Sequence, residues 1–126
     1  MDPKVKLDLA EDWVEKELDD ITCYQAVVGS LMYTALATWP DISYAVAALS
    51  RYNLRRFTSH MTAATRVLQY LKSTADFRLH FDRNDIGNGL VGYSDSDCAD
   101  DSADHKSQGG HVFLASNGAI SWQSRK

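Results

Sequence analysis

The spacing of apolar residues divides the chain into a helical half and a β half. Between residues 22 and 74, apolar positions recur every three or four residues, which predicts three amphipathic helices. We expect Thr22 to cap the first helix, Trp39-Pro40-Asp41 to open the second, and the third to begin near Thr58. The predicted apolar stripes hold Tyr24, Val27, Val28, Leu31, Met32, Ala35 and Leu36 in the first helix, and Met61, Ala64, Val67, Leu68 and Leu71 in the third.

After Asp76 the pattern changes to short alternating runs, which are typical of strands. Four such runs cover residues 77–81, 90–93, 111–114 and 119–122, and turn-forming residues separate them at 84–89 and 116–118. The predicted fold class is therefore α+β: a three-helix bundle followed by an antiparallel meander of three or four strands.

The charged residues are sorted by segment. The 126 residues carry a net charge of −4, and 44% of them are hydrophobic, which suits one globular domain of ordinary size. Residues 1–20 are strongly acidic, residues 51–83 are basic, and residues 84–105 hold aspartates without any lysine or arginine. A basic strip near an acidic pocket suits a protein that binds phosphate and metal in neighbouring places. Mutual neutralisation of the segments within the fold explains the same pattern.

Targeting and cysteine signals are absent from the sequence. No apolar run reaches the roughly 18 residues that a membrane-spanning helix needs, and the first residues lack the apolar stretch of a signal peptide. Cys23 and Cys98 lie far apart and form no local pair. These features predict a reduced, intracellular protein, cytoplasmic or nuclear, without a membrane partner.

One candidate for chemistry is the strand end at Asp95. Enzymes that cleave phosphodiesters with metal ions present an aspartate to the metal from a rigid strand. An aspartate-rich solvated turn has the same sequence pattern. A calcium loop is excluded, because Asp100 stands where glycine is needed and Lys106 where glutamate is needed. A zinc site from Cys98, His105 and His111 lacks a closely spaced second cysteine. No motif supports a serine or cysteine hydrolase.

Several blocks of sequence carry a resemblance to a known family. They read YQAVVGSLMY at 24–33, WPDI at 39–42, RVLQYLK at 66–72, GYSDSDCADD at 92–101 and ISWQS at 120–124. In this order and spacing they resemble copia-type retrotransposon polyproteins over residues 20–126. The chain departs from the family pattern in places, for instance with Cys98 where the family has tryptophan.

The resemblance implies a domain plan and one site residue. It makes residues 21–83 the thumb-like C-terminal end of a reverse transcriptase and residues 84–126 the start of an RNase H-like β region, after an acidic segment at 1–20. It matches Asp95 to the first carboxylate of the RNase H metal site, where the parent family binds Mg²⁺. The other acids of that family's sites match nothing in this chain, and one aspartate cannot hold two Mg²⁺ ions. We therefore expect a truncated, inactive remnant that requires no cofactor.

Three functional hypotheses follow from the sequence. In the first, the remnant binds an RNA–DNA hybrid or another nucleic acid through Arg55, Arg56, Arg66 and Lys72. In the second, it is a protein-interaction module or a host-adopted remnant that binds a protein partner or itself through open strand edges. In the third, it is a decayed reading frame without a selected activity.

Overall fold

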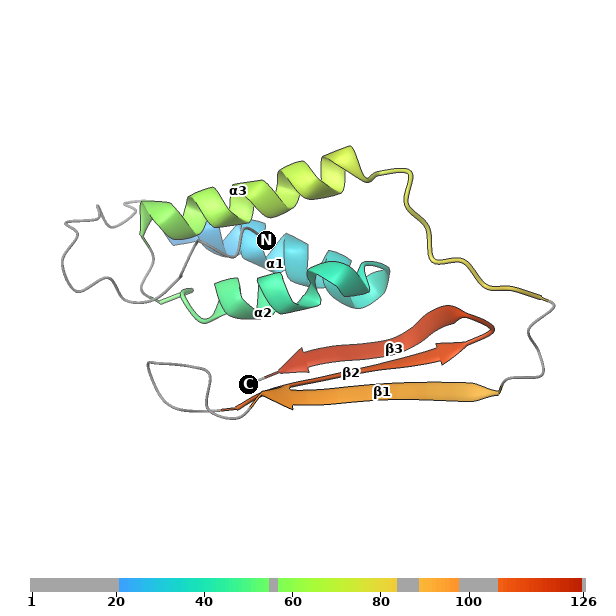
Figure 1. Cartoon of the computed structure of the whole chain (residues 1–126). Helices are drawn as coiled ribbons and strands as arrows, with labels where there is room; N and C mark the ends of the chain where they lie inside the picture. The colour runs from blue at the N-terminus through green and yellow to red at the C-terminus, as the bar shows by residue number, and fades with distance from the viewer. Residues whose placement is uncertain (1–20, 55–56, 84–88, 98–106, 126) are drawn as a thin grey trace. The chain divides into compact units, whose positions relative to one another are not determined.

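The predicted α+β class is confirmed by a computed structural model of the chain (Figure 1), which describes residues 21–54, 57–83, 89–97 and 107–125. Within these ranges, three α-helices precede a three-stranded antiparallel sheet. The chain divides into two compact units, residues 1–75 and 76–126. The functional domains inferred from the resemblance, with their boundary after residue 83, stay predictions.

The helical unit contains α1 (Ile21–Ala37), a short 3₁₀ helix η1 (Pro40–Ile42), α2 (Ser43–Ser50) and α3 (Thr58–Ser73). Pro40 lies in the first turn of η1, where its missing N–H costs no hydrogen bond, as the sequence predicts. The three α-helices pack around one apolar core, which is made by Tyr24, Val28, Leu31, Ala35, Ile42, Val46, Leu49, Ala63, Ala64 and Val67.

Two details of the helix prediction are wrong. Thr22 lies inside α1 and not before it. Met32, Leu36 and Leu68 belong to the predicted stripes, yet their side chains are 38%, 69% and 43% exposed. Apolar residues occupy a wider part of the circumference of α1 than the part that the neighbouring helices of the bundle cover. The stripe thus predicted the helix correctly but overestimated its buried side.

The sheet consists of β1 (Leu90–Asp97), β2 (Gln108–Ala115) and β3 (Gly118–Arg125), in the order β1-β2-β3. Ser116 and Asn117 form the turn between β2 and β3, and both have positive φ angles, of 48° and 62°. Left-handed conformations at both central residues define the turn type that matches the twist of a two-residue hairpin. The hairpin signal at 116–118 is thus confirmed.

The run at 77–81, which the alternation also presented as a strand, is irregular in the structure. Phe77 and Phe81 are 67% and 52% exposed, so the alternation does not mark a buried face. This segment meets the hairpin turn: the Asp82 N–H donates to the Ser116 carbonyl at 2.7 Å, and the Phe81 ring lies against Gly118. The contact is local and lacks the ladder of backbone hydrogen bonds that would make a fourth strand.

The helices of the described residues are short or contain many polar groups. None of them is both long enough and apolar enough to cross a bilayer. The cellular compartment stays a prediction from the sequence.

Candidate nucleic-acid interface

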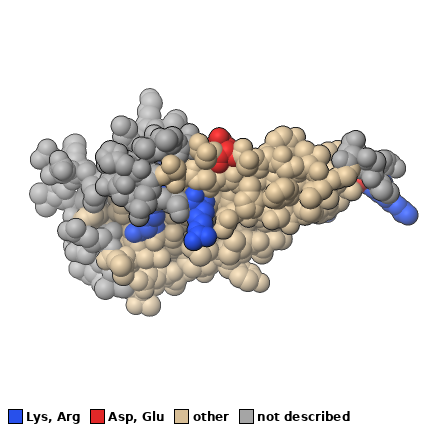
Figure 2. All heavy atoms as spheres, turned by 90° about the horizontal axis from the view of Figure 1, so that it is seen from below, with Lys and Arg blue, Asp and Glu red and all other residues tan. Residues whose placement is uncertain are grey.

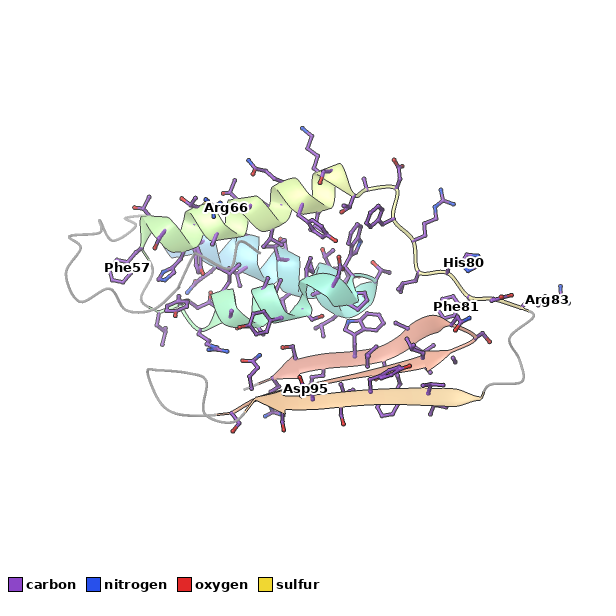
Figure 3. All side chains as sticks on the ribbon, viewed as in Figure 1. Phe57, Arg66, His80, Phe81, Arg83 and Asp95 are labelled. Atoms are coloured by element: carbon purple, nitrogen blue, oxygen red, sulfur yellow. The ribbon has the colours of Figure 1, made fainter. Side chains whose placement is uncertain are left out.

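The exposed side of α3 is polar and free of acidic residues. The whole helix, Thr58–Ser73, contains no aspartate or glutamate. Arg66, labelled in Figure 3, is exposed, and so is Lys72, as predicted. Lys72 follows Arg66 by six positions, which places the two side chains about 120° apart around the helix. The exposed Thr62, Thr65 and Gln69 lie between these two directions, so the cations border a strip of uncharged polar groups.

Two threonines of this strip satisfy their own hydroxyl groups. Thr62 Oγ1 donates to the Thr58 carbonyl at 3.0 Å, and Thr65 Oγ1 donates to the Met61 carbonyl at 2.9 Å. Each oxygen still has acceptor capacity, and each methyl group stays on the surface. Because both hydroxyl protons are donated within the helix, these two threonines offer no donor to a phosphate, and the donors at the strip are Arg66, Lys72 and Gln69.

The opposite side of α3 fixes the orientation of this strip. Ala63, Ala64 and Val67 are buried in the bundle core. At the start of the helix the Phe57 N–H donates to Nδ1 of His60 at 3.0 Å, which satisfies an otherwise unpaired donor of the first turn. His60 is itself 4% exposed and stacks on the Tyr52 ring at a centroid distance of 4.0 Å.

The C-terminal half of α3 is tied to η1 by a tyrosine and an aspartate. The Tyr70 hydroxyl donates a hydrogen bond to Oδ2 of Asp41. This hydrogen bond, together with desolvation and the negative charge of Asp41, raises the pKa of Tyr70 above its ordinary value of 10.0. The Trp39 ring meets the Tyr70 ring edge-on at 6.4 Å. Nothing in the sequence pattern pairs these residues, because they lie far apart in the chain.

The other two predicted phosphate-binding residues, Arg55 and Arg56, lie outside the described residues. In the view of Figure 2, a few isolated basic and acidic side chains interrupt a largely uncharged described surface. Of the four predicted phosphate-binding residues, the structure therefore describes only Arg66 and Lys72, and both lie on α3.

Asp95 is exposed on β1, in the other compact unit (Figure 3). Its partner across the ladder is Gly110, which in turn pairs with Ser124 of β3. Because Gly110 has no side chain, the neighbouring position on β2 adds no ligand group beside the carboxylate. Oδ1 of Asp95 accepts the backbone N–H of Ser96 at 2.9 Å. The carboxylate is thus hydrogen-bonded within its own strand.

The described residues do not fit a magnesium or zinc site. They contain no group of three His, Cys, Asp or Glu side chains close enough to share an ion. Asp97 belongs to β1, but its side chain is outside the described residues, as are Cys98 and His105. His111, the third residue of the zinc alternative, lies beside Phe113, with 5.5 Å between the two ring centroids.

Comparison with known proteins gives several extended similarities. The chain is 40% identical over 103 residues to the secreted RxLR effector protein 161 of Plasmopara viticola, a match that covers 82% of this chain and 72% of that protein. It is 42% identical over 102 residues to the retrovirus-related Pol polyprotein from transposon TNT 1-94 of Nicotiana tabacum. It is 37% identical over its full 126 residues to the corresponding polyprotein from transposon RE1 of Arabidopsis thaliana.

These matches identify the class of protein, because the chain is similar to a segment of retrovirus-related transposon Pol polyproteins. The chain belongs to the copia-type retrotransposon Pol polyprotein family, as its sequence motifs indicate. It spans only 8% of the length of each of the Nicotiana and RE1 polyproteins. No family model matches the chain, and no solved structure matches it.

Proposed function

We propose that the chain is a non-catalytic nucleic-acid-binding segment of a copia-type polyprotein, and that α3 contacts the phosphates of an RNA–DNA hybrid. The observation that carries the proposal is the acid-free exposed strip of α3, bordered by Arg66 and Lys72. The bundle core holds this strip in place from the opposite side. In domain terms, the helical unit corresponds to the thumb-like end of the reverse transcriptase.

The chemistry of the strip suits phosphate contacts that do not read sequence. Arg, Lys and Gln side chains donate hydrogen bonds to the nucleic-acid backbone, and those contacts position a protein without selecting a base. If Arg55 and Arg56 join Arg66 and Lys72, about four phosphates are neutralised. With about four phosphate contacts on a duplex, the affinity falls roughly a hundredfold when the salt concentration rises from 50 to 200 mM.

Asp95 enters this proposal as a vestigial residue. It corresponds by resemblance to the first carboxylate of an RNase H-like site, and it lies within the exposed strand β1, two residues before the strand ends, and not at the strand end that the sequence predicts. A single carboxylate that is already hydrogen-bonded to Ser96 cannot place two Mg²⁺ ions for phosphodiester cleavage. The chain on its own therefore binds a hybrid without cutting it, and Asp95→Asn leaves its affinity for the hybrid unchanged.

Fluorescence anisotropy with a labelled RNA–DNA hybrid tests the proposal. We expect saturable binding at 50 mM salt that weakens about a hundredfold at 200 mM and does not require Mg²⁺. Arg66→Glu/Lys72→Glu should weaken binding by at least tenfold. The matched control is Arg78→Glu/Arg83→Glu, which changes the net charge equally at exposed positions outside α3. Equal losses in both variants, or no binding at 50 mM salt, would contradict the role of α3.

A second function is favoured by a specific observation on the sheet. Among the described residues, β1 and β3 each pair with β2 alone, and every described side chain of β1 is exposed. Such edges and faces bind partner strands. If anisotropy shows no nucleic-acid binding, the protein-interaction function becomes the better proposal. Its test is the variant Ser121→Pro, which changes the middle of the β3 edge. We expect it to abolish binding to a partner protein captured by the unchanged chain, while the helical unit stays folded.

A further inference from the structure

The imidazole of His60 lies in the first turn of α3, beside two aromatic rings. The side chain of His60 is 4% exposed. The Tyr52 ring stacks on the imidazole with 4.0 Å between the centroids and 20° between the planes, and the centroid of the Phe57 ring lies 5.7 Å away. His60 is therefore a buried titratable group at the start of the helix that carries Arg66 and Lys72.

One hydrogen bond fixes which ring nitrogen of His60 carries the proton. The Phe57 N–H donates to Nδ1 at 3.0 Å. A nitrogen that accepts a hydrogen bond carries no proton, so the neutral ring has its proton on Nε2. An imidazolium carries a proton on both nitrogens. Protonation of His60 would therefore place a second donor against the Phe57 N–H, and the hydrogen bond at the start of α3 would be lost.

The surroundings of His60 offer little that would stabilise a positive charge. His60 is the third residue of α3, and the N-terminus of a helix has a positive partial charge. Among the described residues of the helical unit, Asp41 alone has a carboxylate. Asp41 accepts a hydrogen bond from Tyr70, which lies about 15 Å beyond His60 along α3. Within the described part of the unit, a proton on Nδ1 would thus create a buried cation without a nearby anion.

The other helices of the bundle do not change this result. Both α1 and α2 contact α3. The titratable and basic groups of these two helices and of the residues that follow α2 are Cys23, Tyr24, Tyr33, Tyr44, Arg51 and Tyr52. None of these side chains is a carboxylate. The Tyr52 and Phe57 rings attract a cation, but neither ring supplies the acceptor nitrogen that the Phe57 N–H would lose.

We propose that His60 is a pH-sensitive switch at the start of α3, in which a proton on Nδ1 breaks the hydrogen bond from Phe57 and opens the first turn of the helix. In the open turn the imidazole is solvated and binds a proton near the ordinary histidine pKa of about 6.5, whereas in the closed turn its acceptor role keeps it neutral. The stabilisation of the closed turn is thus fully present above pH 6.5 and is lost as the pH falls. Between pH 7 and pH 5 the open fraction should rise roughly twentyfold.

Hydrogen exchange of single amides, followed by NMR on the full chain at pH 7 and pH 5, tests the proposal. The protection factor of the Phe57 amide, which corrects for the intrinsic pH dependence of exchange, should fall roughly twentyfold. The Thr74 amide donates to the Tyr70 carbonyl at the other end of α3 and should keep its protection factor. The measurement involves no nucleic acid, so its result is independent of the proposed function of α3.

The variant His60→Gln separates titration from the loss of the acceptor. A glutamine at the third position of a helix can accept the Phe57 N–H through its amide oxygen, as in a capping box, but it does not titrate. The Phe57 protection factor of this variant should therefore be the same at pH 7 and pH 5. The matched control is His80→Gln, which removes an exposed histidine of the other unit and should behave like the unchanged chain.

The ring nitrogens of His60 can also be observed directly, without any variant. Their NMR signals in the unchanged chain should show a protonated Nε2 and a bare Nδ1 at pH 7. A proton on Nδ1 would overturn the proposal, and so would a Phe57 protection factor that falls no more than in His60→Gln. A protection factor that rises in acid would overturn it as well, because a carboxylate from outside the described residues would then pair with the imidazolium.

Discussion

The hydroxyl of Tyr70 on α3 donates a hydrogen bond to the carboxylate of Asp41 in η1. These residues belong to two sequence blocks, WPDI at 39–42 and RVLQYLK at 66–72, that carry the family resemblance. The structure thus brings both blocks together at the C-terminal half of α3. Asp41 has a structural role here, because it holds the helix that presents Arg66 and Lys72.

Loss of this hydrogen bond should be visible at alkaline pH. The pKa of Tyr70 is raised, so its protonated form is favoured in the folded chain. The resulting stabilisation is complete below the ordinary tyrosine pKa near 10 and is lost as pH rises through the higher pKa of the folded state. In an ultraviolet absorbance titration, Tyr70→Phe should remove a component that titrates above pH 10. Asp41→Asn should lower the pKa of that component, since it removes the negative charge.

The imidazole of His60 should contribute to stability as a hydrogen-bond acceptor. His60→Phe keeps an aromatic ring beside Tyr52 but leaves the Phe57 N–H without its partner on Nδ1. We expect a loss of about 1–3 kcal/mol in the free energy of unfolding by urea. His60→Ala should cost more, because it also removes the buried ring. If both variants unfold like the parent chain, the hydrogen bond has no stabilising role.

The contact between Gly118 and the segment at 77–83 leaves no room for a side chain. A carbon added at Gly118 would overlap the Phe81 ring and lie 2.8 Å from the His80 carbonyl oxygen. Gly118→Ala should therefore displace this segment, break the hydrogen bond between Asp82 and Ser116, and speed hydrogen exchange of the Asp82 amide by at least tenfold. The clash should be smaller in a Phe81→Ala background. Unchanged exchange in Gly118→Ala would contradict this packing.

A buried tyrosine links the first two helices. The Tyr24 hydroxyl, in a side chain that is fully buried, donates to the Leu49 carbonyl at 2.9 Å. Tyr24→Phe preserves the apolar packing and should lower the free energy of unfolding by about 1 kcal/mol. Leu49→Ala opens a cavity in the same core and should cost about 2–5 kcal/mol. Chemical denaturation of both variants checks whether packing outweighs the hydrogen bond here.

The helices and strands could largely be predicted from the sequence, because their apolar periods differ. The period of three to four residues located α1 and α3, and the turn residues at 116–118 located the hairpin between β2 and β3. Periodicity does not show how much of an apolar stripe is covered by neighbouring helices. For this reason the prediction that Met32 and Leu36 are buried is wrong. Alternation at 77–81 was misleading because a strand also needs a partner strand for its backbone.

The candidate interface could be predicted only in part. The charges of Arg66 and Lys72 and their solvent exposure follow from the helical period. The contacts that hold α3, between Tyr70 and Asp41 and between His60 and Phe57, depend on tertiary approach or on a cap that histidine seldom makes. The metal-site role of Asp95 came from resemblance alone, and the described residues supply no second carboxylate beside it.

The hairpin between β2 and β3 contains one residue more than its pairing needs. Leu114 pairs with Ala119 and Phe113 pairs with Ser121, so Ile120 is left over as a bulge. Deletion of Ile120 would join two pairs that are already in register, and would leave Val112 opposite Trp122. Deletion of Ser121 would keep the later pairs as well, because Ile120 would then pair with Phe113 and Trp122 would stay opposite Val112. The bulge thus gives this hairpin a place at which a codon can be lost without loss of register, whereas in a strand without a bulge such a loss turns the later side chains to the other face.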